Sequence, residues 1–474
     1  MSKDPPGPKD ACFGFSLAHR FRHQPLTFLP ELAHTYGDIA SFRMGPFRTY
    51  LIFHPELIHE VLAAKAKCFR RWEWQTSVLR QWDGNGLVIS DGDFWRRQRR
   101  LVQPAFHPRR FAAYGSVMVS ATRQLIDRWH SEPDQPIEIV RTMTGLTLEI
   151  IAKVLFDVDV SSEVRCLGEA VAILSDTAMR EMSSPVRLPD WLPLPAKRRK
   201  RWAMRYLDRT IRTIIGERRA SGADKGDLLS MLLMAVDEGS GMTDQQARDE
   251  AMVLFLAGHD TTAAALAWVC YLLARYPQVQ ERVADEVRTV LGGQNPTAED
   301  ITRLPYTEAA IKETLRLYPP AWIWFAREAV EDVEIGGYTI PKGGIVYATP
   351  WVTHRDPRWF SEPERFDPDR FLPGRFERLP PCAYFPFGAG PRGCIGNVFA
   401  MTEMVLVMAC LCQRIWLSLA PNQGEPDLTP LLALRPRGDV WLTAERRTTV
   451  VATASFNPEP TATALVTPSP LAPG

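Results

Sequence analysis

A cysteine in a glycine-rich loop is the residue of this chain best suited to chemistry. Residues 387–396 read FGAGPRGCIG, so Cys394 follows an arginine by two positions and precedes an apolar segment. Glycines let a backbone approach a flat ring closely, and backbone N–H groups directed at a sulfur tune the metal that it binds. Cys394 is therefore a candidate axial thiolate for haem iron, which predicts a redox enzyme.

The same loop also contains the pattern of a nucleotide-binding turn. Gly388, Gly390 and Gly393 spell G-x-G-x-x-G. That fingerprint requires a strand before it and an acidic residue about twenty positions after it. Here CAYFPF precedes the loop, and Glu403 comes too early. The context therefore disfavours a dinucleotide site.

Five fixed positions of the loop carry a family resemblance. The pattern FxxGxRxCxG is met by Phe387, Gly390, Arg392, Cys394 and Gly396, and it resembles the haem-binding signature of the cytochrome P450 superfamily. The resemblance implies that these residues contact haem b (iron protoporphyrin IX), with Cys394 as the only protein ligand to iron. It also implies a mainly α fold with a minor β-sheet portion.

A long apolar helix is predicted upstream of the loop. Thr243 and Gln246 form a capping-box pattern and Pro277 gives a stop, which together predict a helix of about 33 residues. Its length and apolar character would suit a membrane span, but Asp260 lies near its centre at a high insertion cost. A buried core helix is better supported. Gly258 and the neighbouring hydroxyls predict a weakened centre that opens a groove.

Within that helix, an acid precedes an alcohol. Oxygen activation over a haem needs protons from donors that are positioned without admitting bulk water. The bland alternative is a threonine bonded to its own helix and an ion-paired aspartate. The run AGHDT resembles the AGxDT element of the family, which implies that Thr261 donates a hydrogen bond to bound oxygen and that Asp260 relays protons.

Haem propionates need cationic partners. Trp95 and Arg99 lie four residues apart, on one helical face, and place an indole N–H beside a guanidinium. The pair resembles the WxxxR of the family, which makes Arg392 and Arg327 the other propionate partners. The intervening residues Arg96 and Arg97, with Arg100, are interpreted as a solvated basic face whose charge suits docking of an acidic ferredoxin.

A further pair is interpreted as scaffold. Glu313 and Arg316 stand at i and i+3 of a predicted helix that Pro319 ends. Any surface helix could carry such a pair. The pair resembles the ExxR of the family, which implies a buried network with Arg365 that supports the haem loop.

Composition limits the class of protein. The 474 residues are 45% hydrophobic, and 56 basic against 55 acidic residues leave no global charge for nucleic acid. The eight cysteines are scattered, so reduced thiols are expected. The first residues show neither a signal peptide nor a membrane anchor, which predicts a cytoplasmic protein. We expect one domain over residues 1–446, with short strands near 39–53, 333–349 and 431–443, and a disordered tail over 447–474.

These features predict a monooxygenase that inserts one oxygen atom of O2 into a C–H bond of a lipophilic molecule. The sequence contains no flavin domain and no ferredoxin-like cysteine cluster, so a separate ferredoxin, flavodoxin or reductase must supply electrons. Ala257, Ala264 and residues 321–325 would line an apolar chamber for a terpenoid, fatty acid or steroid. Two alternatives are a peroxide-driven or hydroperoxide-rearranging haem-thiolate enzyme and a non-catalytic haem sensor.

Overall fold

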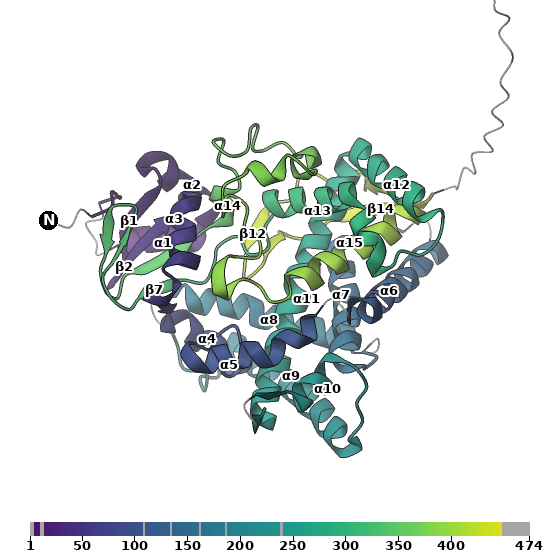
Figure 1. The fold of residues 1–474 in the computed structure, drawn as a ribbon, viewed down its shortest axis with the longest axis horizontal. Coiled ribbons are helices and arrows are strands. Elements are labelled where there is room, and N and C mark those ends of the chain that lie inside the picture. Colours follow the sequence, from purple (N-terminus) through teal and green to yellow (C-terminus); the bar gives the residue numbers. More distant parts are fainter. Residues whose placement is uncertain are drawn as a thin grey trace, which may run out of the picture.

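The computed structural model describes residues 4–9, 14–107, 110–132, 135–160, 163–184, 187–237 and 240–447. Helices form most of the molecule, and the largest sheet lies at one end of it (Figure 1). The predicted mainly α fold with a minor sheet portion is confirmed. The domain boundary stays a prediction, because the proposed tail lies outside the described residues except for Arg447.

The described helices are distributed between residues 15 and 414, and several begin at a proline, which is favoured in the first turn. The α-helices are α1 (Phe15–His23), α2 (Pro25–Tyr36), α3 (Pro55–His59), α4 (Glu73–Asp83), α5 (Gly92–Val102), α6 (Phe111–Ser131), α7 (Ile139–Phe156), α8 (Val164–Met182), α9 (Pro195–Ser221), α10 (Leu228–Met234), α11 (Asp244–Arg275), α12 (Pro277–Leu291), α13 (Pro305–Leu317), α14 (Pro350–Thr353) and α15 (Asn397–Arg414).

Strands occur in each of the three regions where they are predicted. They are β1 (Ile39–Met44), β2 (Phe47–Ile52), β3 (Phe69–Arg71), β4 (Ile137–Glu138), β5 (Val236–Asp237), β6 (Ser240–Gly241), β7 (Arg327–Ala329), β8 (Val333–Ile335), β9 (Tyr338–Ile340), β10 (Ile345–Ala348), β11 (Ile415–Leu419), β12 (Leu428–Pro430), β13 (Leu434–Pro436) and β14 (Trp441–Arg446). The largest sheet has the order β1-β2-β10-β7-β3, in which β10 runs parallel to β2 and the other pairs are antiparallel.

The helix α11 forms the centre of the fold and contacts α7, α13 and α15 (Figure 1). Its capping box is present: the Thr243 side chain accepts from the Gln246 N–H, and the Gln246 side chain accepts from the Thr243 N–H. Among the described residues, α11 and α15 are long and apolar enough to cross a membrane, but 78% and 67% of their apolar windows are buried. The prediction that α11 is a core helix is confirmed.

The centre of α11, where the sequence predicts a weakened helix, shows the expected side-chain hydrogen bond but no break in the helix. The helix continues without a break through Gly258, and the Thr261 hydroxyl donates to the Ala257 carbonyl at 3.0 Å. Gly258 instead lies against α7, where a Cβ would stand 3.0 Å from Cδ1 of Ile151. The glycine therefore permits close packing of two helices, and tertiary contacts compensate for its poor helix propensity.

The predicted scaffold pair is buried and bidentate. Arg316 donates to both carboxylate oxygens of Glu313, at 2.6 and 2.7 Å, and both side chains are fully buried. Its remaining N–H groups bond to the carbonyls of His354, Pro363 and Arg365. One guanidinium thus fixes the long loop that leads to the thiolate loop.

The assignment of Arg365 as a side-chain partner is wrong. Its guanidinium is 62% exposed and pairs with Glu362, and only its backbone carbonyl meets Arg316. The second cation at Glu313 is Arg370, whose Nε lies 3.4 Å from Glu313 Oε1. The sequence motif identified the correct segment, but the chain turns so that the arginine five residues later faces inward.

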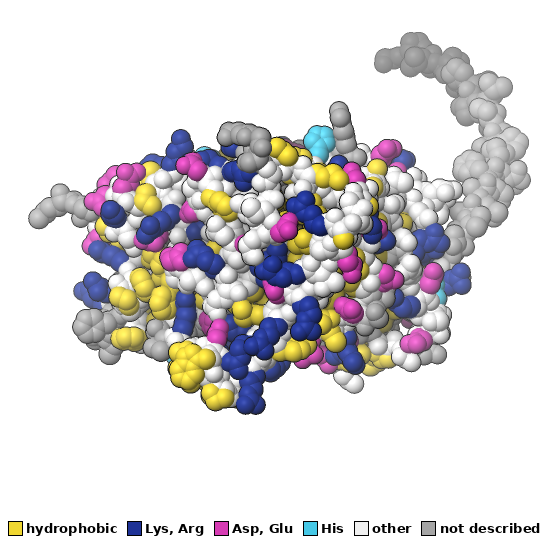
Figure 2. Space-filling model, turned by 90° about the horizontal axis from the view of Figure 1, so that it is seen from below, with side chains coloured by type: hydrophobic (Ala, Val, Ile, Leu, Met, Phe, Trp, Pro, Cys, Tyr) yellow, Lys and Arg dark blue, Asp and Glu magenta, His cyan; other side chains and the backbone are white. Residues whose placement is uncertain are grey.

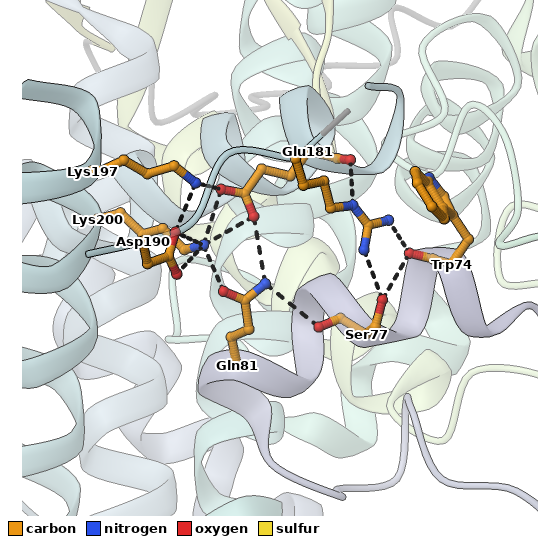
Figure 3. A network of polar contacts seen from close by, with 8 residues as sticks. Trp74, Ser77, Gln81, Glu181, Asp190, Lys197 and Lys200 are labelled. Carbon is orange, nitrogen blue, oxygen red and sulfur yellow. Dashed lines mark hydrogen bonds and ion pairs between the residues drawn. The ribbon is translucent and has the colours of Figure 1, made fainter. Parts of the chain in front are cut away.

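A polar network fixes the segment between α8 and α9 (Figure 3). Lys200 is 1% exposed, pairs with Glu181 of α8 and with Asp190, and donates to Gln81 of α4 at 2.6 Å. Lys197 meets the same two carboxylates at 2.7 Å. Within the basic run 197–201, Lys197 and Lys200 are therefore ion-paired, whereas Arg198 and Arg199 are exposed. The network ties three helices together.

We predict that the two arginines of the scaffold differ sharply in their effect on stability. Arg316→Leu leaves the Glu313 carboxylate buried without its main partner and should cost about 3–5 kcal/mol of unfolding free energy. Arg365→Ala removes an exposed side chain and should change it by less than about 0.5 kcal/mol. Denaturant titration of the two variants checks this, and equal losses would contradict the network.

Candidate functional site

An interior cavity of about 700 Å³ lies between α11 and the loop that contains Cys394. Its wall is mainly apolar, and it receives side chains from α4, α5, α8, α11 and the segment after α13. The cavity also reaches the residues at the start of α1 and at the hairpin between β1 and β2. These segments are far apart in the sequence, so only the folded chain brings them around one space.

Cys394 faces this cavity from a tightly held loop. Its backbone N–H donates to the Phe387 carbonyl at 2.8 Å. Gly390 has φ +66°, and a Cβ there would lie 2.0 Å from the carbonyl oxygen of Leu62, so the position requires glycine. Gly396 precedes α15, and a Cβ on it would stand 4.0 Å from Cys394 Sγ.

Two opposing effects act on the thiol. Burial raises the pKa of Cys394, whereas the backbone N–H of Gly396 and the charge of Arg99 lower it. A coordinated metal cation deprotonates a thiol outright, and the N–H and the guanidinium then stabilise the thiolate. Among the described residues, no group of three or more His, Cys, Asp or Glu is placed to hold a metal ion.

Guanidinium groups gather beside the thiol, around Trp95. Arg392 lies 4.0 Å and Arg99 5.9 Å from the centre of the Trp95 ring. Arg99 donates to the carbonyl of Gly393 at 3.0 Å, which links α5 to the thiolate loop. Arg327 is 8% exposed, and burial, followed by the charge of Arg392, lowers its pKa to about 10.

A fourth arginine in this cluster was not predicted. Arg71 on β3 stands directly opposite Arg327 on β7, and like charges in that register repel. Its Nε and Nη1 are buried without a hydrogen-bond partner in the described chain, and burial lowers its pKa strongly. Asp91 pairs with the guanidinium of Arg392, and from Arg71 it accepts the backbone N–H but no side-chain N–H.

The alternation of side chains along a strand is the sequence signal that could have identified Arg71. The neighbouring Arg70 points to the other side of the sheet, where it pairs with Glu328 at 2.8 Å and is 58% exposed. A period of two therefore sends one arginine of the FRRW run outward and the next inward. The cluster has more cations than anions, which fits a ligand that carries two carboxylates.

Asp260 and Thr261 of α11 have different surroundings. Asp260 is buried, forms an ion pair with Arg435 of β13 and accepts from the Ser175 hydroxyl at 3.2 Å. Thr261 faces the cavity. His259 bonds to Thr147, and burial lowers its pKa to about 3, so this imidazole is neutral. An ion-paired aspartate is the arrangement that the structural alternative in the sequence analysis described.

The residues present fit haem. A thiol faces the cavity, and glycines permit close approach of a flat ring. The buried guanidinium nitrogens of Arg71 have no hydrogen-bond partner within the described chain and could bind the carboxylates of haem. The sequence profile described as Cytochrome P450 matches residues 5–442.

The chain belongs to the cytochrome P450 family.

Relatives with named activities support this placement. Cyclooctatin synthase of Streptomyces melanosporofaciens is 40% identical over 89% of this chain and 90% of its own. Cyclooctat-9-en-7-ol 5-monooxygenase of the same organism is 38% identical over 84% and 86%. Pentalenene oxygenase of Streptomyces avermitilis is 34% identical over 89% and 93%. This cytochrome P450 is therefore a monooxygenase, and its family implies a haem iron cofactor.

The residues that line the cavity of this cytochrome P450 are nearly those that were predicted. Ala257 and residues 321–325 line it, but Ala264 is buried outside it and Ala265 takes its place on the helix face shared with Thr261. The Trp322 indole donates to the Leu431 carbonyl at 2.9 Å. This hydrogen bond satisfies the polar end of a side chain in an otherwise apolar wall.

We predict that Cys394→Ser abolishes the thiolate absorption band of the reduced carbon-monoxide complex, because no other described cysteine faces the cavity with such a loop. Cys410→Ser, in the buried part of α15, should retain it. A normal thiolate band in the Cys394 variant would assign the ligand elsewhere.

A second prediction concerns Arg71. Arg71→Leu removes one charge-assisted contact, worth about 1.5–3 kcal/mol, and should speed haem loss about 10- to 100-fold. Arg70→Leu, on the outer side of the same strand, is the matched control and should leave the rate unchanged. The transfer of haem to excess apomyoglobin measures both rates, and equal rates would remove Arg71 from the cofactor site.

Proposed function

We propose that this cytochrome P450 hydroxylates a terpenoid, with Cys394 as the axial ligand of haem b. The observation that carries the proposal is that the Cys394 thiol and the Thr261 hydroxyl line one apolar cavity. The cofactor, when bound, supplies the activation of O2 that oxidises an unactivated C–H bond. The chain's own residues bind the cofactor and substrate, exclude water and deliver protons.

The cofactor contacts follow from the geometry. Trp95, Arg99, Arg392 and Arg71 would hold the two propionates, because all four line the same end of the cavity. Arg327 does not line the cavity, but it stands opposite Arg71 and would add its charge to theirs. Phe387, Gly390 and Gly396 would shape the loop that carries the thiolate.

Proton delivery is assigned to two neighbours on α11. The Thr261 hydroxyl, at the cavity surface, donates a hydrogen bond to the Ala257 carbonyl. A rotation about χ1 would direct the hydroxyl proton into the cavity. Asp260 is buried beside it, with its charge balanced by Arg435, so a proton could reach the cavity without bulk water. This acid and alcohol favour O2-dependent oxidation over a peroxide-driven enzyme or a haem sensor, which would need neither.

The substrate class rests on the chamber and on the relatives. The wall is apolar, with aromatic side chains from residues 322–325, and it suits a lipophilic molecule. Two relatives are named for pentalenene and for cyclooctat-9-en-7-ol, which are terpenoids. We therefore favour a terpenoid over a fatty acid or steroid.

Electrons would come from a separate ferredoxin, flavodoxin or reductase. Basic side chains gather on the face seen from below, where α4, α5 and α9 lie (Figure 2). On α5, Arg96 and Arg100 are exposed and Arg99 contacts the thiolate loop. A positive surface so close to the thiolate suits an acidic partner. We also propose a cytoplasmic location, which fits bacterial relatives and the unpaired cysteines of the described residues.

We predict that Thr261→Ala uncouples the enzyme. The variant should bind haem and substrate normally, yet lose about 10²- to 10⁴-fold in the step that needs a positioned donor, so that reducing equivalents form peroxide. Thr261→Ser keeps the hydroxyl and should keep most of the coupling. Product per nicotinamide oxidised, measured with a reconstituted ferredoxin and reductase, decides the matter, and unchanged coupling in the alanine variant would exclude Thr261 from proton delivery.

A further inference from the structure

A carboxyl group in the cavity wall has no role in the chemistry described so far. Asp83 is the last residue of α4, is 6% exposed and lines the cavity. Within the described chain, no hydrogen bond or ion pair reaches its side chain, and its Oδ1 is buried without a partner. Native proteins rarely bury a carboxyl in this state, so the group calls for an explanation.

The polar side chains near Asp83 form hydrogen bonds to other groups and none to its carboxyl. On α11, Asp249 accepts the backbone N–H of Asn85 at 2.9 Å, and Glu250 accepts that of Leu87 at 3.0 Å. Arg248 donates to the Trp82 carbonyl and to Asp249. These contacts fix the turn after α4 against α11. Asp83 is therefore held in the cavity wall, although its own side chain does not contribute to these contacts.

The surroundings of Asp83 in the cavity are apolar. Leu79 and Leu87 flank it in sequence, Val253 of α11 lies beside Gly86, and all three line the same space. A hydrocarbon that displaced water from this region would leave the carboxyl unpaired, whereas a substrate with an oxygen atom here would satisfy it. A site built in this way rejects the analogue that lacks the polar group.

We propose that Asp83 recognises a hydroxyl group that the substrate already carries, and that the natural substrate is therefore an oxygenated terpenoid rather than a terpene hydrocarbon. This inference rests on the proposed function and names the substrate class of that same site. The reaction that supplies such a substrate is an earlier hydroxylation or a cyclisation that ends by capturing water.

The position of Asp83 also places that hydroxyl on the substrate. A Cβ at Gly84 would meet the Asp249 carboxylate, and one at Gly86 would meet the Val253 side chain, so the turn is level with residues 249–253 of α11. Eight to twelve residues of helix separate this level from Thr261, about 12–18 Å at 1.5 Å per residue. The hydroxyl should therefore lie at the end of the molecule remote from the carbon that is oxidised.

The protonation state of Asp83 determines whether its carboxyl can donate a hydrogen bond to the substrate or only accept one. Burial raises the pKa of Asp83 to about 8, with Arg248 lowering it and Asp249 raising it, and Glu250 has a pKa of about 8 for the same main reason. The Asp83 carboxyl is then neutral at pH 7, so it can donate to an ether or hydroxyl oxygen. Above its pKa it can only accept, from a hydroxyl.

The test uses the haem-loaded ferric enzyme and three matched probes: the tricyclic diterpene abietadiene, its alcohol abietadienol, and the methyl ether of that alcohol. Spin-state titration gives a dissociation constant for each. The wild-type enzyme should bind the alcohol and, at pH 7, the ether at least about 10-fold more tightly than the hydrocarbon.

Two variants isolate the carboxyl. Asp83→Leu should abolish the preference, because the hydrocarbon then leaves no carboxyl unpaired and binds more tightly while the alcohol and the ether lose their partner. A preserved preference would overturn the proposal. Asp83→Asn keeps a donor and an acceptor but cannot ionise. Its ether binding should stay constant as pH rises from about 6.5 to 9, while that of the wild type falls, so this comparison decides the question even if Asp83→Leu does not load haem.

The products give a further check. Oxidation of abietadienol by the wild type should occur at the ring end opposite the hydroxyl, and oxidation beside the hydroxyl would contradict the placement of Asp83. Failure of the proposed function looks different, because the reduced carbon-monoxide complex would then lack the thiolate band or no probe would be oxidised. Equal binding of the three probes with normal turnover would refute only the role of Asp83.

Discussion

Repulsion among buried cations is the constraint on which the site depends. Arg71 and Arg327 face each other across a strand pair, and Arg392 and Arg99 lie against one indole, while Asp91 is the only carboxylate that pairs with any of them among the described residues. Burying such charges without anions is costly, so a dianionic ligand stabilises the folded state through this cluster.

The rest of the fold holds that cluster beside the thiol. The five-stranded sheet supplies Arg71 and Arg327, α5 supplies Arg99, and the thiolate loop supplies Arg392. Arg99 also donates to the carbonyl of Gly393, so a cation of the cluster is bonded to the loop that carries Cys394. In the proposed site, cofactor binding and the position of the thiolate are therefore coupled through one side chain.

The sequence predicted the elements whose signals are local. The capping box at Thr243 and the stop at Pro277 gave α11 almost to the residue, since both act within one turn of helix. The loop around Cys394 was identified because its glycines have a backbone reason, which the φ of Gly390 confirms. The roles of the individual site residues remain proposals.

Other features depended on contacts between distant segments. Gly258 packs against Ile151, and Arg370 takes the place expected for Arg365, and neither choice is visible in local sequence. The same holds for Lys200, whose partners come from α4, from α8 and from the loop before α9 (Figure 3). The local sequence does not show which lysine of a basic run is paired, because the carboxylates come from distant segments of the chain.

The length of α11 then acquires a functional meaning. One continuous helix carries Thr261 near the thiolate loop and, two to three turns earlier, the residues that hold the turn of Asp83. Because the helix is uninterrupted, these two polar points of the cavity are at a fixed separation. A substrate whose hydroxyl binds at the proposed Asp83 site is therefore presented near Thr261 in a defined orientation. The helix that the core requires thus also sets the distance that would determine regioselectivity.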